Sequence, residues 1–414
     1  MSGGSAPSGD QTRLTLKPPQ ALYFHIPFCA QRCRYCDFLT EVVSLDDPRL
    51  DNYLYSLIGT IRNASSLGSL SSIETIYVGG GTPSYFGHGR LVELAYTLSL
   101  FMDFSKLREF TVEANPDSFS LTLARDLYAL GVNRISLGVQ SFNDAELSAL
   151  GRVHDVATAV RAIEAAQSRF ENVSLDLICG IPGQTPASWL DSVSKAIDLG
   201  VKHISVYALQ LEPNTVLTAD VVAGRVELAD EDTQATMLSL AAEHLEQAGF
   251  ERYETASYAQ AGFECRHNIA YWTGVPYLGL GRGAASMLSF YDGRRLRSTD
   301  LDQTDSILAV IQSVVLGKPL DEVLCRKTQS GELLTKEQAL VEDLMLGMRL
   351  SRGLSKDCLA TATKMVPGVA ATFAELVDLD LVRDKGTSLV PTQKGWLLGN
   401  ELFSRIWALA KPLS

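Results

Sequence analysis

The chain has 414 residues, a hydrophobic content of 46% and a formal net charge of −12. A single hydrophobic core stops growing at roughly 250–300 residues, so the length predicts at least two domains. The negative charge disfavours non-specific nucleic-acid binding, and no basic patch for a membrane surface is evident. No apolar run approaches the roughly 18 residues that a membrane-spanning helix needs.

Residues 1–20 are rich in Gly, Ser and Pro and lack an apolar signal core, which predicts a flexible N-terminal tail. Of the seven cysteines, three cluster and four are scattered, which is not the pattern of a disulfide framework. Together with the lack of an export signal, this predicts a cytoplasmic protein in a reducing compartment.

Between residue 21 and about residue 211, short apolar runs alternate with helical patterns. The candidate strands span residues 21–28, 73–80, 109–116, 134–141, 172–180 and 203–211, and the candidate helices between them include 51–63, 91–104, 120–130, 156–170 and 186–199. Near-continuously apolar strands that alternate with helices predict parallel pairing with the helices outside. Six units are too few for a closed eightfold barrel. We therefore expect an α/β fold with a partial (β/α)6 barrel over residues 21–295 and its chemistry at the C-terminal strand ends.

The first predicted strand leads into Cys29-Ala-Gln-Arg-Cys33-Arg-Tyr-Cys36, which places three thiols within eight residues. Iron–sulfur clusters are held by cysteine thiolates, normally four per cubane, but the position two beyond Cys36 is Phe38. The simplest interpretation is a four-iron cluster with one iron open to a small molecule. A zinc site is the alternative, but zinc loops usually carry a second set of ligands, and none follows here.

Glycine and polar residues stand at the ends of the later strands. The stretch Gly79-Gly-Gly-Thr-Pro-Ser84 follows the second strand and suits either a tight turn or a close approach of the backbone to a ligand. Glu113 and Asp176 interrupt apolar runs near strand ends, and we expect both to face a site because a carboxylate is costly to bury without a partner. Gln140 ends the fourth strand. Arg152 follows it, and the sequence alone fits it equally well as a surface cation.

Residues 250–295 are aromatic and punctuated by glycine, which predicts a strand–loop–strand segment lining a cavity. Imidazole suits haem iron, so His267 is a candidate axial ligand, and Tyr271 and Trp272 offer stacking surface. The alternative is that His267 only holds a loop in place through hydrogen bonds. Arg282, inside a glycine stretch, has no assigned role beyond pairing with a carboxylate.

Residues 296–414 are expected to form a small, mostly helical C-terminal domain. Residues 335–349 are strongly amphipathic, and residues 376–395 predict a helix, a turn, a short two-strand wing and a helix, as in a winged-helix module. The usual role of that module is DNA binding, but no basic recognition face accompanies it here.

The spacing CxxxCxxC, with Tyr35 before the last cysteine, resembles the signature of the radical S-adenosylmethionine (SAM) superfamily. The preceding Tyr23-Phe-His-Ile-Pro-Phe-Cys29 resembles its oxygen-independent coproporphyrinogen oxidase branch. The resemblance implies a four-iron cluster ([4Fe-4S]) on the three loop cysteines, a protein reductant, and reductive cleavage of SAM. It implies SAM contacts from Tyr23, Gly80, Gly81, Thr82, Glu113, Gln140, Arg152 and Asp176. It also implies that the C-terminal domain packs over the barrel mouth, where we expect it to act as a lid and a stability element.

Two departures distinguish the chain from coproporphyrinogen dehydrogenases, which show CxxxCxxCxC and a longer N-terminal segment. Here Phe38 takes the last cysteine position, and only 28 residues precede Cys29. The motif His267-Asn-Ile-Ala-Tyr-Trp272 resembles the HNxxYW pattern of the HemW haem chaperone branch. That resemblance implies binding of haem as well as of the cluster and SAM, delivery of haem to acceptor haemoproteins, and no porphyrinogen decarboxylation.

The main alternative is oxidative decarboxylation of coproporphyrinogen III to protoporphyrinogen IX. A pure interaction module has little support, because it leaves the cysteine and glycine motifs without a purpose. Peripheral membrane contact is compatible with a respiratory acceptor of haem, although no residue pattern demands it. Whether SAM is cleaved or only bound stays open.

Overall fold

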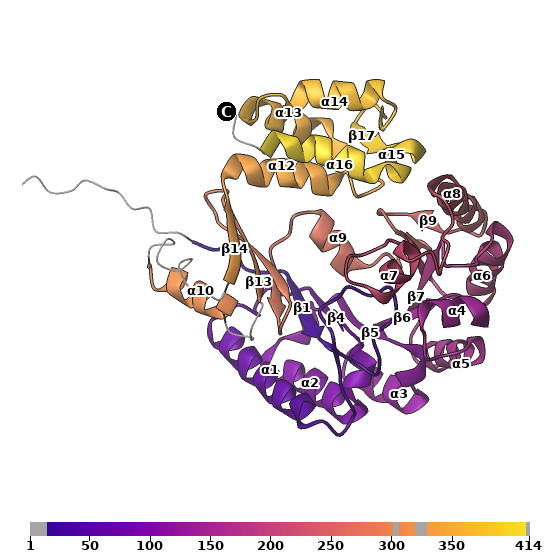
Figure 1. The fold of residues 1–414 in the computed structure, drawn as a ribbon. Coiled ribbons are helices and arrows are strands. Elements are labelled where there is room, and N and C mark those ends of the chain that lie inside the picture. Colours follow the sequence, from indigo (N-terminus) through magenta and orange to yellow (C-terminus); the bar gives the residue numbers. More distant parts are fainter. Residues whose placement is uncertain (1–14, 301–305, 319–328, 411–414) are drawn as a thin grey trace, which may run out of the picture.

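A 12-stranded sheet dominates the computed structural model, which describes residues 15–300, 306–318 and 329–410 (Figure 1). The strand order is β14-β13-β12-β11-β1-β4-β5-β6-β7-β8-β10-β9. Its centre consists of parallel strands: β1 (Ala21–Ile26), β4 (Thr75–Gly80), β5 (Glu109–Ala114), β6 (Arg134–Gln140), β7 (Asn172–Cys179) and β8 (His203–Ala208). The predicted partial (β/α)6 barrel is confirmed.

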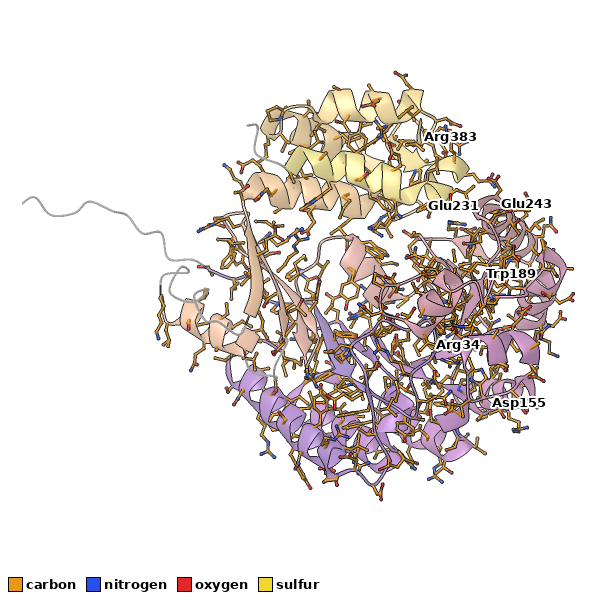
Figure 2. All side chains as sticks on the ribbon, viewed as in Figure 1. Arg34, Asp155, Trp189, Glu231, Glu243 and Arg383 are labelled. Atoms are coloured by element: carbon orange, nitrogen blue, oxygen red, sulfur yellow. The ribbon has the colours of Figure 1, made fainter. Side chains whose placement is uncertain are left out.

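Helices connect these strands and cover the outside of the barrel (Figure 1). They are α1 (Pro48–Ser66), α2 (His88–Phe101), α3 (Leu121–Ala129), α4 (Asp144–Leu150), α5 (Val156–Gln167), α6 (Pro186–Asp198), α7 (Val216–Val222) and α8 (Glu231–Gln247). The apolar faces of most of these helices pack on the outward side chains of the strands to form the main core, whereas Leu150 of α4 and Leu217 of α7 belong to a separate, smaller cluster. Trp189 of α6, labelled in Figure 2, is fully buried, and its Nε1 donates to the backbone oxygen of Met237 in α8 at 2.9 Å.

Additional strands extend the sheet at both edges. Beside β1 come β11 (Tyr277–Leu280), β12 (Ala285–Ser289), β13 (Arg295–Asp300) and β14 (Gln329–Leu334). Beside β8 come β10 (Ser257–Ala259) and β9 (Glu251–Arg252). The strands expected in residues 250–295 are therefore present, but the expected loop between them is wrong in one respect. It contains the short helix α9 (Arg266–Trp272), which is too short to show a helical period in the sequence.

A second hydrophobic core lies in the C-terminal part of the chain. Its residues come mainly from α12 (Lys336–Gly347), α13 (Lys356–Met365), α14 (Val369–Asp378), α16 (Gly399–Trp407) and the strands β15 (Leu354–Ser355), β16 (Val382–Asp384) and β17 (Ser388–Pro391). The short helix α15 (Gln393–Leu397) connects β17 to α16. The helix α10 (Ser306–Val315) belongs to the main core instead. Because the large sheet continues to Leu334, we propose a domain boundary near residue 335 rather than at residue 296.

The C-terminal domain packs against the N-terminal ends of the barrel strands. Two antiparallel pairings separate β13 from β11, so β13 runs parallel to β1, and Arg295 begins it at the same end as Ala21. Arg295 pairs there with Glu342 and Asp343 of α12. The cysteine loop follows the opposite end of β1. The domain therefore covers the end of the barrel opposite to the cysteine loop, and its role as a lid and stability element stays a prediction.

Residues 15–20 are part of the fold, although the sequence predicted a flexible tail up to residue 20. The backbone N–H of Lys17 donates to the oxygen of Ser289 at 2.8 Å, and that of Tyr291 donates to Thr15 at 3.0 Å. The remainder of the predicted tail, residues 1–14, lies outside the described residues. Among the helices that the structure describes, none has the length and apolar character needed to cross a membrane.

Candidate functional site

The cysteine loop, residues 29–36, leaves the C-terminal end of the barrel. Cys29 is buried in the short strand β2 (Phe28–Cys29), which pairs with β3 (Glu41–Val42), whereas Cys33 and Cys36 are half-buried. Two backbone hydrogen bonds of Arg34 hold the loop. Its N–H donates to Leu150 O at 3.1 Å, and its carbonyl oxygen accepts from Leu217 N–H at 2.8 Å. The side chain of Arg34, labelled in Figure 2, pairs with an aspartate of α7. The fold thus presents three thiols on one anchored loop.

Two of the predicted SAM residues touch these thiols. Cys29 Sγ lies 3.3 Å from Thr82 Oγ1, and Cys33 Sγ lies 3.4 Å from Arg152 Nη1. Nη2 of Arg152 donates to Asn115 Oδ1 at 2.8 Å. Arg152 therefore faces the cysteine loop from within the fold, and the alternative of a surface cation is excluded.

The glycine stretch after β4 lies directly against the cysteine loop. A Cβ on Gly81 would stand 2.9 Å from the oxygen of Phe28 and 3.0 Å from Cys29 Sγ. Gly80 has φ +120°, a conformation that side chains disfavour, and a Cβ there would meet the ring of His25 at 2.9 Å. The glycines therefore allow the backbone to pack closely against the cysteine loop, and the predicted close approach to a ligand stays a prediction.

Glu113 and Asp176 face the barrel interior, as expected for carboxylates at strand ends. Tyr77 OH donates to Glu113 Oε1 at 2.6 Å, and Gly80 N–H donates to Oε2 at 3.2 Å. Burial raises the pKa of Glu113 to about 7 and also raises that of Asp176. Arg134, 2% exposed, is the nearby cation that opposes both shifts. The interior thus carries two carboxylates and one buried guanidinium.

Five partly exposed tyrosines face the interior of the barrel. Tyr207 keeps 44% of its surface accessible, although burial among protein groups raises its pKa well above the usual range. Tyr23, Tyr77, Tyr271 and Tyr277 combine the same two properties. A ring that is surrounded by protein and yet keeps accessible surface faces an internal space. The predicted SAM residue Tyr23 is thus on the interior side of the barrel, where its hydroxyl lies 3.0 Å from His25 Nδ1.

Gln140 is buried at the end of β6 in an unusual backbone conformation. Its φ is +71°, and the register of β6 with β7 shifts between Leu137 and Gln140. A Cβ on Gly138 would approach Gln140 Nε2 to 2.9 Å, so the glycine makes room for this side chain. A non-glycine residue with positive φ is strained, and such positions cluster at functional sites.

A small cleft opens beside the cysteine loop. Its lining includes Cys33 together with Thr82 and Arg152, two of the predicted SAM residues. Asn115 also lines it, donating to Thr82 Oγ1 at 3.1 Å and accepting from Arg152. The sequence analysis did not assign Asn115, although it directly follows the strand that carries Glu113. Its position at a strand end was the available signal.

The donor set fits an iron–sulfur cluster better than a single metal ion. Within the described part of the chain, no three His, Cys, Asp or Glu side chains converge as ligands of one ion. A zinc ion draws its ligands to one centre, whereas a four-iron cluster distributes thiolates over separate irons. Phe38, where a fourth cysteine would stand, is 63% exposed. Three thiols and an exposed phenylalanine are suited to a cluster with one iron free of protein.

Comparisons with known proteins agree with this geometry. The family described as Radical SAM superfamily matches residues 23–196, and the HemN C-terminal domain matches residues 334–398. A protein named Heme chaperone HemW from Lactococcus lactis is 33% identical, over 94% of this chain and 98% of its own length. The chain belongs to the HemW family. Its Bacillus subtilis member is also 33% identical, over 93% of this chain and 98% of that protein.

HemW membership confirms the branch that the sequence motifs indicated. A solved structure, the coproporphyrinogen III oxidase HemN of Escherichia coli, aligns with a TM-score of 0.74 at 22% identity, covering 95% of this chain and 90% of that one. This likeness shows that the fold is shared. The match to the HemN C-terminal domain begins at residue 334, next to the domain boundary proposed above.

The HNxxYW segment of this HemW-family chain does not offer its histidine to a ligand. His267 is 0% exposed, its Nδ1 lies 2.9 Å from Thr75 Oγ1, and its Nε2 lies 3.0 Å from Tyr271 OH. Its ring stacks on Tyr77 at 5.1 Å, and burial lowers its pKa to about 3. The structure supports the alternative that His267 holds its segment in place. The prediction of an axial haem ligand is not supported, because both ring nitrogens are engaged.

Glu109, at the start of β5, anchors this segment and was missed by the sequence analysis. Its carboxylate accepts from the backbone N–H groups of Arg266 (2.7 Å) and His267 (3.1 Å) at the N-terminus of α9. A negative charge there satisfies free N–H groups and the positive end of the helix dipole. The signal was a charged residue at the start of an otherwise apolar strand.

Arg282 pairs with a carboxylate, which is the only role that the sequence analysis suggested for it. It pairs with Glu41 on β3, and its backbone N–H donates to Tyr53 OH at 3.0 Å. Tyr53 in turn donates to the oxygen of His25 at 2.7 Å. The loop between β11 and β12 is thereby fastened to the segment that follows the cysteines.

Proposed function

We propose that this chain is a haem chaperone that carries a [4Fe-4S] cluster on Cys29, Cys33 and Cys36, binds SAM and haem, and delivers haem to acceptor haemoproteins. The observation that carries the proposal is the match, over more than nine-tenths of both chains, to proteins named Heme chaperone HemW. Phe38 in place of a fourth cysteine supports it over the dehydrogenase alternative.

The cysteine loop would hold the cluster, and Arg152 beside Cys33 would offset the negative charge of the thiolates. SAM would lie in the adjoining cleft, with contacts from Gly80, Gly81, Thr82, Glu113, Gln140 and Arg152, and with Tyr23 and Asp176 on the barrel side. When bound, the cluster supplies one electron to SAM, which requires a protein reductant. Glu113 in its ionised form would accept hydrogen bonds from the ammonium group of SAM.

The buried setting of Glu113 suits this role. A carboxylate with a pKa of about 7 becomes fully charged when a cation binds next to it. Arg134 lies near both Glu113 and Asp176 and favours their ionised forms. The six described cysteines are all free thiols, which supports a reducing, cytoplasmic setting for the cluster.

The test is made anaerobically on one preparation with a reconstituted cluster, SAM and dithionite. Haemin binding and coproporphyrinogen III turnover are measured side by side, with Cys33→Ser as the variant that disrupts the cluster. Stoichiometric haemin binding without protoporphyrinogen supports the chaperone. Formation of protoporphyrinogen IX would mean instead that the chain is an oxygen-independent coproporphyrinogen dehydrogenase.

A further inference from the structure

The six histidines of the chain all fall within the described residues, and none of them lines the cavity described below. Three have both ring nitrogens in hydrogen bonds: His25, His203 and His267. His154 is buried, with Nε2 bonded to a backbone oxygen and Nδ1 without a partner among the described residues, while His88 and His244 lie on the outer helices α2 and α8. A haem iron bound in the cavity described below therefore needs a ligand other than histidine.

A cavity of about 420 Å³ lies on the inner face of the strands that extend the sheet beyond β1. Among its lining residues, Tyr277, Arg297 and Glu332 lie in register on β11, β13 and β14, with the buried Met287 of β12 between the first two. Leucines at alternating positions of these strands turn to the opposite face and join the main core. The volume falls within the usual range for cofactor-sized ligands. A wide, open cavity of this kind suits a planar ligand that the protein must later release.

Tyr277 is the lining residue suited to bind ferric haem iron. Its ring meets Tyr271 edge-on at 4.6 Å, and within the described residues its hydroxyl makes no hydrogen bond, unlike those of Tyr23, Tyr77 and Tyr271. Burial and the nearby Glu342 carboxylate raise the pKa of Tyr277 to about 12, whereas Arg297 and Arg295 act to lower it. The two cations thus oppose the effect of Glu342 on a phenolate. Tyrosine is an established ligand of haem iron.

Arg297 is positioned to receive a propionate. Its Nη1 donates to Glu342 Oε1 at 2.8 Å, and its guanidinium lies 5.3 Å from the ring centre of Trp407. Its other nitrogen pairs with Glu332, whose side chain is largely exposed. An exposed pair is worth about 1 kcal/mol or less. A propionate can therefore displace Glu332 while Glu342 and Trp407 keep the arginine in place.

We propose that haem binds in this cavity, with Tyr277 as its iron ligand and Arg297 as the partner of one propionate. The inference rests on the proposed function. On binding, Tyr277 Oη replaces water or hydroxide on ferric iron, the phenolic proton leaves to solvent, and the iron stays ferric. The HNxxYW segment then acts as a positioning element, because His267 holds Tyr271 and Tyr271 packs against Tyr277.

The experiment titrates haemin into the full chain with its cluster reconstituted, so that the loop thiols are not free to bind iron. The variants are Tyr277→Phe and the matched control Tyr207→Phe, which removes another hydroxyl from the barrel interior. Thermal melting of each variant verifies folding. We expect Tyr277→Phe to lose the visible charge-transfer band of phenolate–iron(III) and to bind haemin at least about tenfold more weakly. Tyr207→Phe should keep both properties.

A second arm tests the propionate. Arg297→Gln should weaken haemin about tenfold but leave the binding of haemin dimethyl ester unchanged, because the ester carries no charge for the guanidinium. Arg297→Lys should restore part of the difference. This arm stays informative even if Tyr277→Phe fails to fold.

Several results would overturn the inference. They are an unchanged spectrum and affinity in Tyr277→Phe, loss of the band in Tyr207→Phe instead, or an equal effect of Arg297→Gln on haemin and its ester. If the unmodified chain binds no haemin, the proposed function fails and the inference falls with it. If the chain binds haemin and only the variants contradict expectation, the site assignment alone is wrong.

Discussion

At the scale of single residues, the charge of Glu113 is the property most open to measurement. Burial raises its pKa to about 7, and Asp176 adds to the shift, while Tyr77, Gly80 and Arg134 oppose it. Near neutral pH the carboxyl is therefore partly protonated. A cationic ligand group binds the ionised form, so binding must expel a proton when the pH is below about 7.

We expect SAM affinity to rise with pH up to about 7 and to level off above it. The slope below pH 7 should approach one decade per pH unit, because one proton is released. Calorimetry in buffers of different ionisation heat, at several pH values, measures both the affinity and the proton count. Glu113→Gln should bind more weakly and show a flat profile. A flat profile in the unmodified chain would remove Glu113 from the ammonium site.

His267 shows that the identity of a residue in the sequence does not by itself reveal whether it binds a ligand or stabilises the fold. An imidazole in an aromatic segment suits haem iron or a hydrogen-bonded core equally well in sequence. Only tertiary structure brings Thr75, nearly two hundred residues earlier in the chain, to its Nδ1. The strand-end rule placed Glu113 near the site, whereas the family resemblance placed Thr82 and Arg152 there.

We therefore expect His267→Ala to destabilise the fold by about 2–4 kcal/mol, through a cavity beside Tyr77 and unpaired hydroxyls on Thr75 and Tyr271. Urea unfolding followed by circular dichroism measures the change. His88→Ala, which removes an exposed pair with Asp126, serves as the control and should cost about 1 kcal/mol or less. Equal effects of the two substitutions would contradict the structural role of His267.

At the scale of elements, the parallel strands were predictable because both of their faces are buried and their sequences are near-continuously apolar. The polar residues at the opposite strand ends were not. Thr75, Glu109, Arg134 and His203 each begin or nearly begin a strand, where a sequence reader expects a loop. Their side chains point into the barrel because the sheet curves and α9 packs against its N-terminal end. No local sequence pattern predicts either feature.

The cysteine loop and the glycine stretch form one packed unit, so an added methyl should disturb the cluster. Gly81→Ala would press on the oxygen of Phe28 and on Cys29 Sγ. We expect a stability cost of about 1–3 kcal/mol and a lower iron and sulfide content per chain after reconstitution. Gly89→Ala in α2 is the control, since nothing lies within 4 Å of its added Cβ. Full iron loading in Gly81→Ala would show that the cysteine loop accommodates the added methyl group.

At the scale of the whole molecule, the two ends of the barrel serve different purposes. The C-terminal strand ends carry the cysteine loop and its cleft. The N-terminal ends are closed by α9 and by the C-terminal domain, which also supplies Glu342 and Trp407 to the arginine beside the proposed haem cavity. Docking of that domain and shaping of the cavity therefore depend on the same contacts. This arrangement could not be predicted from the sequence, because the wing pattern fixes the module but not the surface on which it packs.

The buried pair between β13 and α12 should accordingly control the docking of the C-terminal domain. The side chains of Arg295 and Glu342 are 6% and 4% exposed, and Glu342 also binds Arg297. Removing one partner of such a pair leaves buried charge without compensation. We expect Glu342→Gln to cost about 3 kcal/mol, to expose the domain junction to limited proteolysis, and to speed the release of haemin.

The matched control is Asp384→Asn, whose pair with Lys356 is about half exposed on both sides. Such a pair contributes about 1 kcal/mol or less, so its loss should alter neither proteolysis nor haemin release. Scanning calorimetry separates the two cases. If Glu342→Gln melts like Asp384→Asn and keeps its junction protected, the domain is held mainly by apolar packing. The arginine beside the cavity would then owe its position to Trp407 rather than to the buried carboxylate.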